Sequence, residues 1–277
     1  MSTEIGPRTT RRPRRSAAEP RRPAARSRRP AAEPRRPTSR RGRIRRFLPP
    51  QHGAWAMLLL PYLAGVLAVG WSWPHLPLLG AWLAGYLCSY YLFQAVKSRR
   101  IGRFADQLLA YGPVTAMLGV VVAVARPAVL WYAPAFAVLV AVNVWYAARR
   151  RERAIGNDLA SVVQSCLMVP VTATVAGVPA ERVGPVFGAV LLYFVGTVLY
   201  VKTMIRERGH AGYRHASVAY HGVALVVAAW LDPLLAGLFA LLLSRAWVLP
   251  AQRLAPRQVG VLEIVACVLL LAVTLAL

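Results

Sequence analysis

Residues 54–70 read AWAMLLLPYLAGVLAVG, a run without a charged side chain that decides the fold class. A helix needs about 20 mostly apolar residues to cross the roughly 30 Å hydrocarbon core of a bilayer. Outward from this run, eight more runs of similar character follow along the chain. The predicted spans are residues 54–70, 78–96, 108–124, 128–147, 159–178, 185–201, 216–231, 233–249 and 259–277. The sequence therefore predicts an all-α, polytopic transmembrane bundle of about nine spans.

The segment before the first span is basic and rich in arginine and proline. Of the 34 Lys and Arg residues, 17 precede Phe47, and AAEPRRP occurs at residues 17–23 and again at 31–37. Such a segment has nothing apolar to bury, so we expect residues 1–46 to be disordered and residues 47–277 to form the membrane domain. The tail either binds anionic lipid or only fixes orientation. Because the remaining charge flanks the spans, we expect no nucleic-acid partner.

Basic residues are unevenly divided between the connections that join the spans. The connections after the second, fourth, sixth and eighth spans carry fourteen, and the opposite connections carry only Arg126 and Arg182. Cytosolic loops of membrane proteins are enriched in Lys and Arg. The sequence therefore predicts a multi-pass cell-membrane protein with a cytosolic N-terminus and an outer C-terminus.

Polar side chains within the spans gather toward the predicted cytosolic ends. Ionisable and amide side chains are costly in hydrocarbon, so each is a candidate functional residue. Side chains at i, i+4 and i+7 share a helix face, and several polar stripes of this kind end at the basic loops. We expect the stripes to line one cavity that opens to the cytosol and binds an anionic membrane lipid. The predicted ligand-binding residues are Gln94, Lys97, Arg99, Arg100, Asn157, Asp158, Gln164, Tyr200, Lys202, Arg206 and Arg208.

Some of the candidate residues also have structural explanations. Asp158, or Asn157 before it, would cap the fifth span. His221 is either a hydrogen-bonded core histidine or, like His52, a candidate general base. No group of His, Cys, Asp and Glu has the spacing of a metal site, so the sequence predicts neither a metal nor a cofactor.

Other local signals concern how neighbouring spans meet. Arg245 and Glu263 lie at matching depths on consecutive spans, so we expect a buried structural ion pair between them. Asp232 before Pro233 is typical of an N-cap followed by a first-turn proline, which predicts a very short turn there. Prolines inside spans are expected to kink them. These are Pro61, Pro113, Pro134 and Pro170.

Three segments carry a family resemblance. They are Gln51-His52-Gly53-Ala54-Trp55-Ala56 at the first span, RAIGND at residues 153–158 and YVKTMIRER at residues 200–208. Together they resemble the YwiC-like family over nearly all of the chain after the tail. The resemblance supplies a family without implying a reaction.

A weaker likeness is to the UbiA-type intramembrane prenyltransferases, which have nine spans, a cytosolic N-terminus and catalytic loops after the second and sixth spans. Those enzymes use paired aspartates to hold Mg²⁺ on an isoprenoid diphosphate. The corresponding loops here offer only Asp106 and Glu207 as acidic residues, so the Mg²⁺ clamp is absent. The basic residues of these loops would instead bind a diphosphate or phospholipid headgroup directly.

The leading hypothesis is that the cytosolic face binds an anionic, lipid-linked headgroup, with or without chemistry. In an enzymatic version, His52 or His221 is the general base. The alternatives are a small-anion transporter, a prenyltransferase without the aspartate clamp, and a structural membrane partner without a ligand. Transporters hold their substrates near the membrane midplane, where this sequence has few polar side chains, and this counts against transport.

Overall fold

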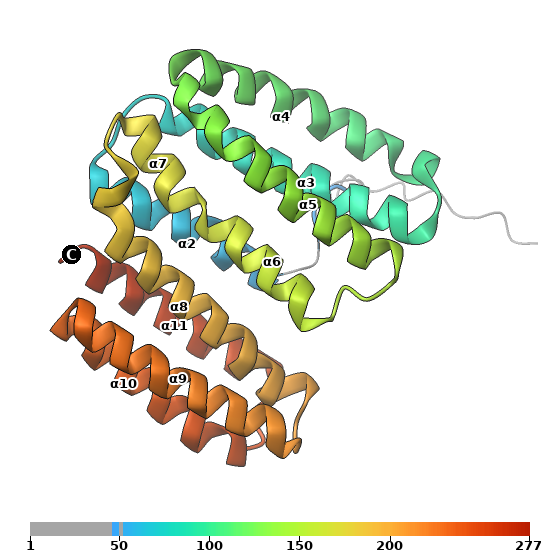
Figure 1. Cartoon of the computed structure of the whole chain (residues 1–277). Helices are drawn as coiled ribbons and strands as arrows, with labels where there is room; N and C mark the ends of the chain where they lie inside the picture. Colours follow the sequence, from blue (N-terminus) through green and yellow to red (C-terminus); the bar gives the residue numbers. More distant parts are fainter. Residues whose placement is uncertain (1–45, 50–51) are drawn as a thin grey trace, which may run out of the picture. The chain divides into compact units, whose positions relative to one another are not determined.

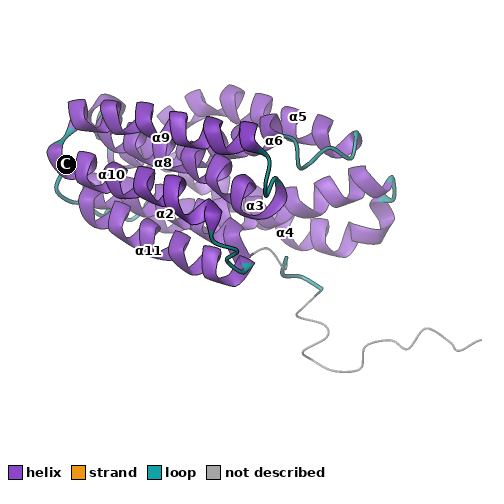
Figure 2. Cartoon of the chain, turned by 90° about the horizontal axis from the view of Figure 1, so that it is seen from below, coloured by secondary structure: helices purple, strands orange, loops and turns teal. Residues whose placement is uncertain are grey.

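The computed structural model describes residues 46–49 and 52–277, except for the side chain of His52. The described helices all belong to one unit, Ile44–Leu277. The predicted tail, residues 1–46, lies outside the described residues apart from Arg46. Every regular element in the described part of the chain is a helix, so the predicted all-α class is confirmed (Figures 1 and 2).

Each predicted range overlaps a helix, and the fifth range contains two helices separated by Leu167. The α-helices are α2 (His52–Val69), α3 (His75–Ser98), α4 (Ala105–Ala125), α5 (Ala133–Ala148), α6 (Ile155–Cys166), α7 (Met168–Ala176), α8 (Gly184–Val201), α9 (Ala211–Leu231), α10 (Pro233–Val248) and α11 (Pro256–Thr274). Short 3-10 turns extend several of them, namely η1 (Ile101–Phe104), η2 (Pro127–Tyr132), η3 (Ala180–Val183) and η5 (Leu249–Ala251). A π-helical turn, η4 (Lys202–Arg206), follows α8.

Seven helical segments among the described residues are long and apolar enough to cross a membrane. They comprise α3, α4, α5, the α6–α7 pair, α8, α10 and α11, with the short turns that extend them. Two predicted spans do not meet this criterion. The apolar helix of the first span, Gly53–Val69, is shorter than the rest. In α9 the polar side chains of Arg214, His215 and His221 lower the mean hydropathy of the first half. The chain is thus a multi-pass helical membrane protein.

The prolines inside the predicted spans act in different ways. At Pro170 the missing N–H cannot bond the carbonyl of Cys166, and the ring crowds that carbonyl, so the helix breaks at Leu167 between α6 and α7. Pro61 and Pro113 lie within continuous helices. Pro134 lies in the first turn of α5, where no N–H is needed, so the predicted kink there is wrong.

The predicted short turn between the seventh and eighth spans is confirmed. Asp232 alone separates α9 from α10, and its carboxylate accepts hydrogen bonds from the backbone N–H groups of Leu234 at 2.7 Å and Leu235 at 3.2 Å. Pro233 occupies the first position of α10. This cap satisfies two N–H groups that a helix start leaves without intrahelical partners.

The helices of this unit form three groups. In Figure 1, α2, α6 and α7 lie between α3–α5 on one side and α8–α11 on the other, and the central helices contact both groups. The central pair α6–α7 is the most buried of the seven long spans. Half of its most apolar stretch is buried, against 6% of the corresponding stretches of the spans that contain α4 and α5. Because α4 and α5 leave most of their apolar surface uncovered, these two helices face lipid in a membrane.

Close helix contacts at the centre depend on a small residue. A Cβ atom added to Gly65 of α2 would lie 2.0 Å from Oγ1 of Thr172 and 3.0 Å from the backbone oxygen of Val169, both in α7. Small residues let membrane helices approach closely enough for backbone and side chains to interlock. Gly65 therefore sets the distance between α2 and α7, which positions the central layer.

Candidate functional site

The four basic connections are bonded to one another at one end of the bundle, which we call the basic end. Lys97 of α3 pairs with Glu152 in the loop after α5, with Nζ 2.6 Å from Oε1. Lys202 of η4 donates to the backbone oxygen of Arg153 in the same loop at 2.7 Å. Arg208, after η4, donates to the backbone oxygen of Leu254 at 2.7 Å. All four loops therefore lie on the same side of the molecule.

Lys202 links two of the segments that carry the family resemblance. Its Nζ lies 2.8 Å from Oδ2 of Asp158, and the lysine side chain is only 6% exposed. Asn157 donates from Nδ2 to the backbone oxygen of Glu152 at 3.0 Å. Neither Asp158 nor Asn157 caps α6, whose N-cap is Ala154 and has no side-chain hydrogen bond. The predicted capping role is therefore wrong, because Lys202 and the preceding loop bind these side chains instead.

The pKa of the Glu152 carboxyl is also shifted from its ordinary value. Partial burial alone raises the pKa of this carboxyl, but the hydrogen bond and charge of Lys97, with smaller contributions from a backbone N–H and Arg153, bring the pKa below its ordinary value. Glu152 is thus ionised at neutral pH and holds α3 against the loop that precedes α6.

A second polar group joins α5 to α6. Asn143 of α5 donates from Nδ2 to Oε1 of Gln164 at 3.1 Å, and Ser161 donates to Oδ1 of Asn143 at 3.4 Å. Gln94 of α3 donates to the hydroxyl of Tyr90 at 3.2 Å, within its own helix. Asn143 and Gln164 thus satisfy each other between packed helices, as buried polar side chains do in general.

A third polar group, which we call the buried polar cluster, consists of Tyr193, Thr197, Tyr200, Arg245 and Glu263. Arg245 of α10 and Glu263 of α11 form an ion pair in which the side chains are only 8% and 14% exposed. The second carboxylate oxygen of Glu263 accepts from the hydroxyls of Tyr193 at 3.1 Å and Thr197 at 3.0 Å, both in α8. Glu263 therefore has donors from two helices besides its own.

Arg245 is less well satisfied than its partner. Its Cζ lies 4.1 Å from the centre of the Tyr200 ring, so the guanidinium stacks on the aromatic face. Its Nε and Nη2 atoms, and the Tyr200 hydroxyl, are buried without a hydrogen-bond partner among the described residues. A buried donor left unsatisfied costs about 1–3 kcal/mol, and more when it is charged. The cluster thus presents donors that lack an acceptor.

His221 of α9 lies beside α8 rather than in an open cavity. Its Nδ1 is 2.7 Å from the backbone oxygen of Ser217, so Nδ1 carries the proton and Nε2 is free to accept. A Cβ atom on Gly196 of α8 would come within 3.0 Å of that Nε2. The Ser217 hydroxyl is another buried group without a partner in the described part of the chain. The side chain of His52, the other candidate base, lies outside the described residues.

The residues predicted to line one cavity fall into separate groups. Gln94, Asn157 and Gln164 belong to the contacts of α3, α5 and α6, and Tyr200 and His221 lie among α8–α10. Arg99, Arg100 and Arg206 are exposed at the basic end. Two surface grooves lie elsewhere, one of 340 Å³ between α10 and α11 and one of 620 Å³ between η5 with the loop that follows it and the start of α11.

Sequence reasoning overlooked His75, which is fully buried at the start of α3. Its Nδ1 accepts from the backbone N–H of Ser72 at 3.0 Å, and its Nε2 lies 3.0 Å from the backbone oxygen of Thr172 in α7. Nδ1 therefore closes the turn before α3, and Nε2 holds the start of α3 to α7. The signal in the sequence was Ser72 three residues ahead, a spacing typical of a turn closed by a side chain.

The comparisons with known proteins follow the same helical region. Residues 48–173 match the family model described as YwiC-like protein. Over 238 residues the chain is 31% identical to a protein of Bacillus subtilis strain 168 described as uncharacterized protein YwiC, which covers 83% of this chain and 97% of that protein. The chain belongs to the YwiC-like family. This YwiC-like protein is also 31% identical over 223 residues to an uncharacterized protein of Haemophilus influenzae, covering 77% of this chain and 90% of that one. No solved structure matches it.

The family model and the buried polar cluster occupy different parts of this YwiC-like protein. The matched residues end within α7, whereas the cluster is built from α8, α10 and α11. Lys202 connects the two parts, because it follows α8 and bonds Asp158 of α6. The basic end thus ties the matched region to the helices that carry the cluster.

Proposed function

We propose that this YwiC-like protein crosses the cell membrane nine times, with the N-terminus and the basic end in the cytosol. Mutual contacts among the four basic connections support this arrangement, because an even number of crossings must separate loops that share one side. In this arrangement α2 is the first span. It is buried on several sides by α3, α7, α8 and α11, which compensates for its short length.

We further propose that the protein binds an anionic lipid headgroup from the cytosolic leaflet. The observation that carries the proposal is the set of unpartnered donors on Arg245 and Tyr200. A phosphate or carboxylate oxygen accepts several N–H and O–H bonds at once, and guanidinium groups suit it particularly well. An anionic ligand therefore satisfies donors that the described side chains leave unsatisfied.

The charge around the cluster is consistent with an anionic ligand. The carboxylate of Glu263 neutralises the positive charge of Arg245, so the cluster alone holds no net positive charge. The exposed cations Arg206, Arg253 in the loop after η5 and Arg257 in the first turn of α11 lie at the same end of the bundle. Basic residues close to a bilayer surface attract anionic lipids by roughly 1 kcal/mol each. We expect these cations to concentrate the ligand and Arg245 to bind it.

Tyr200→Phe is the sharpest test of this proposal, because the hydroxyl that it removes makes no hydrogen bond within the described protein. The variant should keep wild-type thermal stability in detergent and retain less anionic lipid through purification, measured by native mass spectrometry. The matched control is Tyr220→Phe in α9, whose hydroxyl donates to the backbone oxygen of Leu192 at 3.1 Å. This control should lower stability and leave the retained lipids unchanged. Equal lipid profiles in wild type and Tyr200→Phe would contradict headgroup binding.

Transport of a small anion is a second candidate, favoured by the break between α6 and α7. Discontinuous helices in transporters expose helix ends to a substrate near the membrane midplane. Proteoliposomes loaded with inorganic phosphate or chloride test it directly. Anion efflux above that of empty liposomes supports transport, and efflux at the background rate with anionic lipid still retained supports the headgroup proposal alone.

A further inference from the structure

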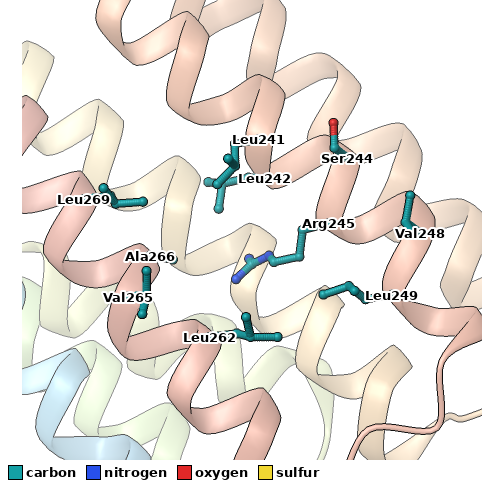
Figure 3. Close-up of a pocket in the computed structure, with 10 residues that line it drawn as sticks. All are labelled: Leu241, Leu242, Ser244, Arg245, Val248, Leu249, Leu262, Val265, Ala266 and Leu269. Carbon is teal, nitrogen blue, oxygen red and sulfur yellow. The ribbon is translucent and has the colours of Figure 1, made fainter.

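The groove between α10 and α11 adjoins the groove between η5 and the start of α11, and the two differ in chemistry. The first is lined by Leu242 and Ala266, both buried, and by the outer side chains of Leu241 and Leu269 (Figure 3). The second lies at the basic end and is lined by Gln252 and Arg257 as well as by apolar side chains. Leu249 and Leu262 line both grooves. Together they form a channel on the surface, apolar along the helices and polar at η5, which we call the α10–α11 groove.

Arg245 connects this groove to the buried polar cluster. Figure 3 shows its guanidinium extending from α10 into the space between the two helices. The side chain is more than nine-tenths buried, and Nε and Nη2 have no partner in the described part of the chain. Arg257 lies farther along the groove and is exposed. No acidic residue lines either groove. The nearby carboxylate of Glu263 instead binds Arg245 and the Thr197 hydroxyl of α8.

A ligand that matches this pattern has an apolar chain along the helices and a polar group at the η5 end. An acyl chain fits an apolar surface that runs along a membrane helix, because lipid tails are the solvent of such a surface. A phosphate at the end of the chain would lie beside Arg257. The Nε and Nη2 atoms of Arg245 have no exposed surface in this structure, so they would donate to that phosphate once the guanidinium turned toward the groove. A second helix would fill the apolar part and leave Arg257 and the unpartnered N–H groups of Arg245 without an acceptor.

We infer that the α10–α11 groove binds one acyl chain of an anionic glycerophospholipid from the cytosolic leaflet, with the phosphate between Arg257 and Arg245. The inference rests on the proposed function and deepens it, because it makes the ligand a membrane lipid that enters sideways. A soluble anion would have no use for the apolar part of the groove. The outer wall at η5 is fixed in place by the hydrogen bond from Arg208 to Leu254.

The test uses the full chain in vesicles of phosphatidylcholine that contain a small fraction of phosphatidylglycerol with a photoreactive group in its acyl chain. After irradiation, mass spectrometry locates the labelled peptides. Labelling should concentrate on α10 and α11. Leu262→Trp places a larger side chain in the lining that both grooves share, so it should abolish most of the labelling of α10 and α11. Val268→Trp is the matched control, because Val268 is 62% exposed on α11 and does not line the grooves.

The end of the groove that would hold the headgroup is tested by removing one cation at a time. Arg257→Gln should reduce the labelling by phosphatidylglycerol about fivefold, the factor expected for one basic residue near an anionic headgroup. Arg253→Gln removes an equally exposed cation that does not line the groove, and it should leave the labelling unchanged. Because Arg257 is exposed, a loss with this variant does not come from misfolding.

The outcomes separate this inference from the proposed function. Labelling spread evenly over α4, α5, α10 and α11, or undiminished in Leu262→Trp, would overturn the groove as the lipid site. If Tyr200→Phe still weakened lipid retention in that case, headgroup binding would stand without the groove. If the purified protein retained no anionic lipid at all, both proposals would fail. If inorganic phosphate alone bound at Arg245, the cluster would be assigned to a soluble anion, and this result would also contradict the inference.

Discussion

Lys202 shows how a single buried cation organises the basic end. Its ammonium group is shared between the Asp158 carboxylate and the backbone oxygen of Arg153, and only 6% of the side chain is exposed. Lys97 makes a similar ion pair with Glu152, but 43% of its side chain is exposed. The geometry of the two pairs is alike and the solvent around them is not. Their energetic contributions should therefore differ.

Lys202→Met should destabilise the protein far more than Lys97→Met. Removing one partner of a buried pair leaves an uncompensated carboxylate and costs about 3 kcal/mol or more. Breaking an exposed pair costs about 0–1 kcal/mol, because water replaces the lost partner. Thermal unfolding of both variants in the same detergent measures the difference. Equal losses would mean that water reaches Lys202 as freely as Lys97.

The Lys97–Glu152 pair should also make stability depend on pH. The pKa of Glu152 is lowered in the folded protein, so the pair stabilises above the unfolded pKa of about 4.3 and loses this effect as pH falls through the folded value. Glu152→Gln should therefore be less stable than wild type at pH 7, and the two should converge as the pH falls through the lowered pKa of Glu152. Glu181→Gln, in the loop before α8 at the opposite end, serves as the control. A constant difference down to pH 3 would contradict the assignment.

At the scale of the elements, the contact between α2 and α7 is the most sensitive to side-chain volume. Gly65→Ala places a methyl group against Thr172 and the backbone of Val169, so it should destabilise by about 1–3 kcal/mol. Gly119 of α4 has no neighbour within 4 Å of an added Cβ. Gly119→Ala should therefore be neutral or stabilising by up to about 1 kcal/mol. A stability assay in detergent that ranked the two glycines equally would contradict the packing described.

Apolar run length predicted where the helices lie, because that signal is local and strong. The site was harder to predict, since it depends on which helix faces meet. The stripe of Tyr193, Thr197 and Tyr200 was visible at helical spacing, but only packing shows that its partners are Glu263 and Arg245. Helical spacing likewise could not show that Asp158 would be bound by Lys202, which lies far along the chain.

For the whole molecule, the proposed topology makes a prediction at every loop. Reporter fusions ending near residues 100, 150, 205 and 255 should report the cytosol, and fusions near residues 74, 127, 182 and 232 should report the outer side. The two helices that fall short of the length and hydropathy criterion, α2 and α9, decide the result. A reversal at the sites near residues 232 and 255, with the site near residue 205 still cytosolic, would remove α9 from the membrane and place α10 and α11 in the opposite orientation.

The central claim is that an anionic headgroup satisfies the free donors of Arg245 and Tyr200. A density map of the protein in nanodiscs that contain phosphatidylglycerol tests it most directly. The account predicts headgroup density within hydrogen-bond distance of Nε and Nη2 of Arg245, continuous with an acyl chain between α10 and α11. A map in which both nitrogens instead donate to protein oxygens, with no density beside Tyr200, would contradict it.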